Sequence, residues 1–97
     1  MYVLRIEHPA PDFGAWKKAF DSDPIGRQRS GVRRYRILRA TDDPAYVMVD
    51  LEFDSLTEVE AMHRILLKLW GQVEGKIIGG PESRIVEVAE TVEYQAR

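Results

Sequence analysis

The sequence predicts an α+β protein with the element order βαββαβ, in which one four-stranded antiparallel sheet carries two helices on a single face. Three observations predict this class: four segments alternate apolar and polar residues, two amphipathic segments lie between them, and turn residues bound them. Right-handed crossover connections place the strands in the order 4-1-3-2. We expect one domain, 1–97, with a loose tail over residues 93–97.

The predicted strands differ in how they are bounded. Pro9 ends the first strand because proline lacks the N–H that a ladder needs, and a turn at 41–44 joins the second and third strands into a hairpin. On the last strand we assign Val86 and Val88 to the face under the helices, and Ile85 to the opposite face. The predicted strands are 2–8, 32–40, 45–53 and 84–92.

Each predicted helix begins at a capping residue. Asp12 precedes a helix over about 12–21, and Ser55 starts a capping box before a helix over about 56–73. The glycine-rich segment 71–81 predicts a loop or a frayed helix end. The apolar stripes are Phe13, Trp16 and Phe20 on the first helix, and Val59, Met62, His63, Leu66, Leu69 and Trp70 on the second.

The sheet face without helices mixes apolar residues with charges of both signs. This mixture suits a self-complementary twofold interface, so we expect a homodimer. The alternative is an exposed sheet with cross-strand ion pairs. The residues assigned to this face are Val3, Arg5, Glu7, Val32, Arg34, Arg36, Leu38, Met48, Asp50, Glu52, Ile85, Glu87 and Ala89.

Composition limits the classes of function. The net charge is −2, and strand alternation splits the arginine-rich stretch 27–39 between two faces, so we expect no nucleic-acid partner. No apolar run approaches the roughly 20 residues of a membrane span, so we expect no membrane partner. The absence of cysteine suits a cytoplasmic location. Without a phosphate-binding loop or a third ligand beside the two histidines, we expect neither cofactor nor metal.

The chain resembles the dimeric α+β barrel (ferredoxin-like) superfamily in its element order, the helix entry at 12–16, the hairpin 32–53 and the closing strand. That superfamily includes antibiotic-biosynthesis-type monooxygenases, haem-degrading monooxygenases and lactone isomerases, and it holds ligands between sheet and helices. Both monooxygenase branches commonly use an asparagine to position substrate or oxygen. This chain has no asparagine, which puts that chemistry in doubt.

The topology predicts a ligand pocket at one end of the core. His8, Phe13, Trp16 and Trp70 are expected to gather there, beneath the glycine-rich segment. We interpret His8 as a general base, or as a strand-end histidine bonded to backbone or water. The aromatic residues either bind substrate or fill the core.

Two further side chains are candidates for this pocket. His63 is a second catalytic candidate, as an acid–base group or a haem ligand, or a satisfied residue at the edge of the core. Tyr35 could donate a hydrogen bond into the pocket.

Three functions fit these observations. The first is a dimer that binds a small aromatic ligand, with or without catalysis. The second is a cofactor-independent monooxygenase, or a related isomerase or cyclase, acting on an aromatic or polyketide-like substrate. The third is a structural or regulatory dimer whose core is filled. A cavity of several hundred Å³ would favour the first two.

Overall fold

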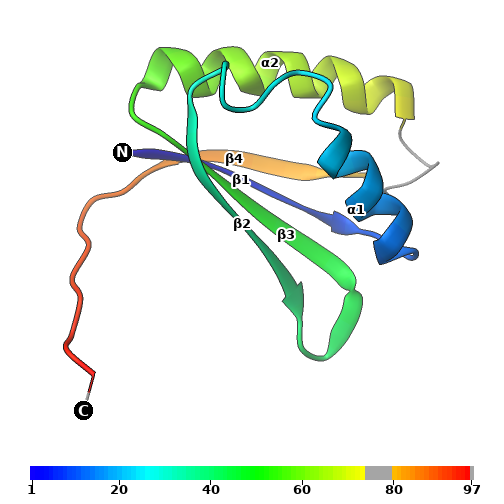
Figure 1. The fold of residues 1–97 in the computed structure, drawn as a ribbon, viewed down its shortest axis with the longest axis horizontal. Helices are drawn as coiled ribbons and strands as arrows, with labels where there is room; N and C mark the ends of the chain where they lie inside the picture. The colour runs from blue at the N-terminus through cyan, green and yellow to red at the C-terminus, as the bar shows by residue number, and fades with distance from the viewer. Residues whose placement is uncertain (74–79, 97) are drawn as a thin grey trace.

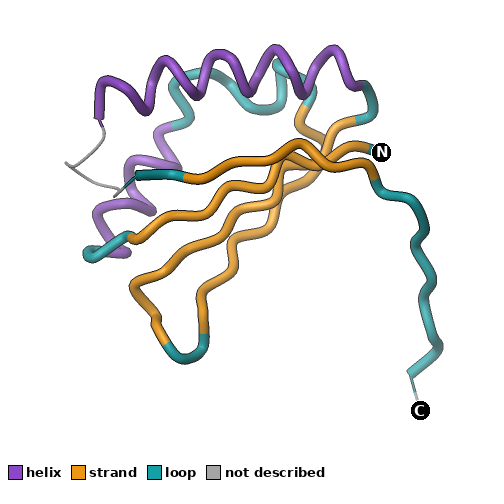
Figure 2. Tube along the Cα trace, turned by 180° about the vertical axis from the view of Figure 1, so that it is seen from behind, coloured by secondary structure: helices purple, strands orange, loops and turns teal. Residues whose placement is uncertain are grey.

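The computed structural model describes residues 1–73 and 80–96, and it confirms the predicted element order. The sheet order is β2-β3-β1-β4 with antiparallel neighbours throughout, which is the predicted order counted from the other edge. Both helices lie on one side of the sheet in the two opposite views (Figure 1; Figure 2). The elements are β1 (Tyr2–Pro9), α1 (Phe13–Ser22), β2 (Val32–Ala40), β3 (Asp43–Phe53), α2 (Leu56–Val73) and β4 (Glu82–Glu87).

Side chains cap the starts of both helices as predicted. The Asp12 carboxylate accepts a hydrogen bond from the Ala15 N–H at 3.0 Å, and the Ser55 hydroxyl accepts one from the Glu58 N–H at 3.1 Å. Asp23 ends α1 in the left-handed conformation, with φ of 49°. The predicted glycine-rich loop falls partly outside the described residues. This part comprises residues 74–79 and includes Gly75 and Gly79.

The core lies between the sheet and the helices. Leu4 lies opposite Leu51, and Ile6 opposite Val49, so these residues point to the same face of the sheet. Burial of each such side chain contributes about 1.5–3 kcal/mol. The buried cluster comprises Leu4, Ile6, Ala10, Trp16, Val32, Val47, Val49, Leu51, Phe53, Val59 and Met62.

Four residues were assigned to the wrong face: Ile85, Val86, Glu87 and Val32. Glu87 lies opposite Tyr2, on the side of the core rather than on the open side of the sheet. Ile85 pairs with Leu4 and packs against the core, whereas Val86 pairs with Val3 on the opposite face. Both residues are apolar, so alternation alone did not identify the inner one. Val32 also lies in the core, because a register shift after it places Arg33 as an extra residue in β2.

The last strand is shorter than predicted and ends at Glu87 rather than at residue 92. β4 pairs only with β1, and β1 begins at Tyr2, which lies opposite Glu87. One more bond follows, from the Val88 N–H to the Met1 carbonyl at 3.0 Å. Residues 88–96, here called the C-terminal arm, form no helix or strand within this described segment and lead away from the body (Figure 1).

The sheet face away from the helices, here called the open face, holds two buried carboxylates under arginine side chains. Arg5 and Arg36 both contact Asp50, with Nε–Oδ1 at 2.9 Å and Nη2–Oδ2 at 3.3 Å. Arg34 contacts Glu52 at 2.8 Å, and this bond and charge raise the pKa of the Arg34 guanidinium. The charges of this face are therefore largely paired within the protomer.

Candidate functional site

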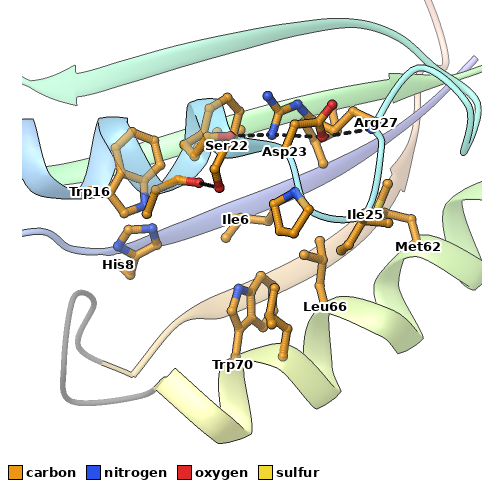
Figure 3. A pocket seen from close by; sticks show the side chains of 16 residues that line it. Ile6, His8, Trp16, Ser22, Asp23, Ile25, Arg27, Met62, Leu66 and Trp70 are labelled. Carbon is orange, nitrogen blue, oxygen red and sulfur yellow. Dashed lines mark hydrogen bonds and ion pairs between the residues drawn. The ribbon is translucent and has the colours of Figure 1, made fainter.

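A cavity of about 270 Å³ lies between the sheet, the two helices and the segment that follows α1 (Figure 3). Its walls are mostly apolar, which is typical of sites for small organic ligands. The sheet contributes Ile6, His8, Val49 and Leu51; α1 contributes Trp16, Ala19, Phe20 and Ser22; the following segment contributes Asp23, Pro24, Ile25 and Arg27; α2 contributes Met62, Leu66, Leu69 and Trp70.

His8 is the main titratable group at one end of this cavity. It lies near the end of β1 and is only 3% exposed. Its Nδ1 lies 2.9 Å from the Pro9 carbonyl oxygen, and a carbonyl only accepts, so Nδ1 carries the proton of the neutral ring. Nε2 then keeps the lone pair. Burial lowers the pKa of His8 below 6.5, against a smaller opposing effect of the Pro9 bond, so the ring is neutral at pH 7.

Aromatic rings form a continuous row beside His8. Trp16 lies 5.6 Å from His8 between ring centroids, and Phe20 lies 5.2 Å from Trp16. The helical spacing of α1 puts both rings on its buried side, as the sequence predicted. Trp70 reaches the cavity from α2, so indole rings line it from both helices (Figure 3).

Arg27 forms the opposite end of the cavity, and sequence reasoning did not place it there. Its guanidinium lies 3.8 Å from the Phe20 ring centroid and donates to the Phe20 carbonyl at 2.9 Å. The Asp23 carboxylate accepts from the Arg27 N–H at 2.9 Å and lies 3.5 Å from its guanidinium. In the sequence, only the turn residues 23–26 indicated that the segment after α1, which contains Arg27, folds back on this helix.

Three of the predicted site residues lie outside the cavity lining. Phe13 contacts Trp16 at 5.7 Å and lies under the Arg39 guanidinium at 4.3 Å. Tyr35 packs edge-on against Phe20 at 5.2 Å and is 42% exposed. His63 instead bonds through Nε2 to the Ser83 hydroxyl at 2.7 Å, which connects α2 to β4.

His63, the candidate haem ligand on α2, does not line the cavity. Its Nε2 is bonded to the Ser83 hydroxyl instead.

No family model and no curated protein matches the sequence. Solved structures match it over nearly its whole length. One is a proposed antibiotic biosynthesis monooxygenase from Nitrosomonas europaea, with 19% identity, TM-score 0.69, and coverage of 93% of this chain and 100% of that chain. Another is a dimeric ferredoxin-like protein from an uncultured marine organism, with 13% identity, TM-score 0.69, and coverage of 96% and 92%.

The heme-degrader MhuD from Mycobacterium tuberculosis also matches, with 16% identity, TM-score 0.66, and coverage of 94% of this chain and 99% of that chain. Similarity at such low identity concerns the arrangement of helices and strands, while function depends on the residues of each site. The chain therefore has the ferredoxin-like α+β fold that is shared by antibiotic-biosynthesis-monooxygenase-like proteins.

Proposed function

We propose that this protein is a homodimer in which each protomer binds a small aromatic molecule with an acidic hydroxyl group. The observation that carries the proposal is a buried imidazole beside indole rings in one apolar cavity. Aromatic walls favour a flat apolar ring system, and a few polar groups fix its orientation. The hydroxyl would donate a hydrogen bond to His8 Nε2, because the Pro9 contact leaves that nitrogen as the acceptor.

The homodimer is supported by the open face. Val3, Leu38 and Met48 lie on this face beside the paired arginines, and a self-complementary twofold contact would bury them. A solved structure with this fold is a dimeric ferredoxin-like protein. The paired charges reduce the cost of removing water from the face, because each carboxylate already has a guanidinium partner.

The ligand site is tested by filling it. Leu66 lines the cavity, whereas the adjacent Leu67 is 51% exposed on α2. With 1-naphthol as the probe, we expect the melting temperature of the wild type to rise with ligand concentration. Leu66→Trp should abolish this rise, while the matched variant Leu67→Trp should keep it. A wild type whose melting temperature 1-naphthol does not raise would contradict the proposal.

The role of the hydroxyl group is tested with a matched ligand. 1-Methoxynaphthalene has the same rings but no hydroxyl proton, so it should stabilise the wild type less than 1-naphthol does. In His8→Leu the difference between the two ligands should disappear, because the hydrogen-bond acceptor is gone. His63→Gln serves as the control and should keep the difference, since His63 lies outside the cavity lining. A difference that survives in His8→Leu would remove His8 from the binding site.

A cofactor-independent monooxygenase is the second candidate, and the neutral state of His8 favours it. A neutral imidazole can act as a general base and take a proton from an acidic C–H or O–H group of the substrate. With an anthrone as the substrate, His8 would take a proton from the methylene carbon, and the resulting carbanion would react with dioxygen. The methylene carbon becomes a carbonyl with one oxygen atom, and the other oxygen atom leaves as water.

Oxygen uptake with anthrone as substrate tests this second candidate. We expect uptake by the wild type, and a loss of about 10²-fold or more in His8→Gln, which is the usual contribution of a general base. His63→Gln should keep the wild-type rate. Anthrone that binds without oxygen uptake would leave the protein as a binding protein and reject the oxygenase.

A further inference from the structure

Arg27 places a positive charge at one end of a cavity whose walls are mostly apolar. Figure 3 shows Arg27 and His8 at opposite ends of it. The rings of Trp16 and Phe20 lie between the two ends, with consecutive separations of 5.6, 5.2 and 3.8 Å from the imidazole to the guanidinium. The two ends are therefore at most about 15 Å apart, so one small molecule can contact both.

The fold uses only one corner of the Arg27 guanidinium. Nη1 donates to the Phe20 carbonyl oxygen at 2.9 Å, and the same nitrogen lies 3.5 Å from the Asp23 carboxylate. Within residues 1–73 and 80–96, neither Nε nor Nη2 of Arg27 has a hydrogen-bond partner. A guanidinium carries five N–H donors in a planar fork, so Arg27 keeps donors that a bound molecule could use.

The position of this guanidinium is fixed before any ligand binds. It lies 3.8 Å from the ring centroid of Phe20 and 5.2 Å from that of Tyr35, and the Arg27 side chain is 17% exposed. A ligand would therefore immobilise few torsions of this side chain and remove little further water from it. The Asp23 carboxylate offsets only part of the charge, because its 3.5 Å separation exceeds the roughly 2.7–2.9 Å of a charge-assisted hydrogen bond.

We propose that Arg27 binds a carboxylate group at the far end of the ligand, so that the protein selects hydroxyaryl carboxylic acids. This inference rests on the proposed function above and adds a second polar group to the same ligand. A planar carboxylate matches the guanidinium fork and can accept two parallel hydrogen bonds from it. The hydroxyl group would contact His8 and the carboxylate Arg27, with the aromatic rings along the row between them. The ligand would then have a single orientation in the cavity.

Matched ligands test for the second polar group. 5-Hydroxy-1-naphthoic acid is 1-naphthol with a carboxyl group on the opposite ring, and this group is ionised at neutral pH. We expect it to bind the wild type about tenfold or more tightly than 1-naphthol in titration calorimetry, because a hydrogen bond between charged groups is stronger than a neutral one. 1-Hydroxy-2-naphthoic acid carries both groups on adjacent carbons and cannot contact both ends of the cavity, so it should show no such gain.

Two methionine substitutions test the dependence on Arg27. Arg27→Met keeps an apolar side chain but removes the charged fork, and it should abolish the preference for 5-hydroxy-1-naphthoic acid over 1-naphthol. Arg29→Met is the matched control and should keep the preference, because Arg29 is exposed and lies outside the cavity lining. If Arg27 only stabilised the end of α1, Arg27→Met would lower the melting temperature without changing the ratio of the two affinities.

Asp23→Asn provides a second test in which Arg27 stays in place. Asparagine tolerates the left-handed backbone at this position, where φ is 49°, and its side-chain oxygen can still accept from the Arg27 N–H. Removal of the negative charge should increase the preference for the carboxylate several-fold. The Arg27 inference is overturned, and the proposed function stands, if 1-naphthol binds while the acid gains nothing or its preference changes in neither variant. If neither ligand binds the wild type, both are overturned.

Discussion

At the scale of single residues, the protonation state of His8 follows from its position. The ring is buried against Trp16 near the end of a strand, and a charged imidazole there would lose its hydration. The Pro9 carbonyl fixes which nitrogen carries the proton. A neutral histidine with one defined acceptor nitrogen is useful for binding a hydroxyl group and for accepting its proton.

This protonation state predicts a pH dependence of stability. The pKa of His8 is lowered from 6.5 in the folded protein, so below pH 6.5 the unfolded chain takes up a proton that the folded chain does not. The contribution of His8 to the free energy of unfolding should therefore fall as the pH decreases through this range and be constant above it. The slope is at most about 1.4 kcal/mol per pH unit.

Urea unfolding between pH 5 and pH 8 measures this effect, at one protein concentration throughout. In His8→Gln the fall in stability below pH 6.5 should be smaller than in the wild type. Parallel curves for the wild type and His8→Gln would show that His8 titrates at its ordinary pKa.

The sequence brought some residues of the cavity lining together and could not place others. His8, Trp16 and Trp70 were predicted near one another because strand and helix periodicity alone sets their direction, and all three line the cavity. Arg27 lies in a loop, where no period applies. Its position depends on the left-handed Asp23 and on a hydrogen bond to the Phe20 carbonyl. Such contacts depend on the tertiary structure.

At the scale of elements, the strands show where the periodicity of the sequence stops being informative. The segments 2–8 and 45–53 alternate cleanly, and their faces were assigned correctly. In β4 the neighbours Ile85 and Val86 are both apolar, so pairing with β1 decided which one faces the core. The extra residue Arg33 in β2 shifts the register, and a bulge has no reliable signal in a single sequence.

Two glycines, one in a turn and one in a helix, predict opposite effects of the same substitution. Gly31, just before β2, has φ of 103°, and an added Cβ would lie 2.5 Å from the Glu58 carboxylate. Gly31→Ala should therefore lower the free energy of unfolding by about 1–2 kcal/mol. Gly71 lies in α2, and no atom of the described residues lies within 4 Å of an added Cβ, so Gly71→Ala should raise it by about 0.5 kcal/mol.

Chemical denaturation of the two variants beside the wild type measures both changes. The comparison is well controlled because each variant adds one methyl group and no charge. Equal stability of the two variants would mean that the left-handed backbone at Gly31 is not maintained in solution.

At the scale of the whole molecule, the uncovered side of the sheet is the surface through which the proposed homodimer would form. Helices bury one side, and the other carries apolar side chains between ion pairs. A chain of 97 residues buries only about two-thirds of the surface of its unfolded form, so a second buried face adds substantially to stability. Its midpoint of unfolding should therefore increase with protein concentration.

Two lysine substitutions test which surface is buried by the dimer. Leu38→Lys places a charge on the open face, where the partner would remove its water, and should convert the dimer to a monomer at micromolar concentration. Leu67→Lys places the same charge on the exposed side of α2 and should leave the dimer unchanged. Light scattering coupled to size-exclusion chromatography gives the mass of each variant. Dimeric Leu38→Lys would place the contact elsewhere.

The two indole rings of the cavity give the protein an intrinsic optical reporter. Trp16 and Trp70 are the only tryptophans in the sequence, and both line the cavity. All tryptophan emission therefore originates beside the proposed ligand, with no background from distant parts of the chain. A shift or quenching of that emission would report occupancy in unlabelled protein, and single replacements by phenylalanine would assign the signal to one helix or the other.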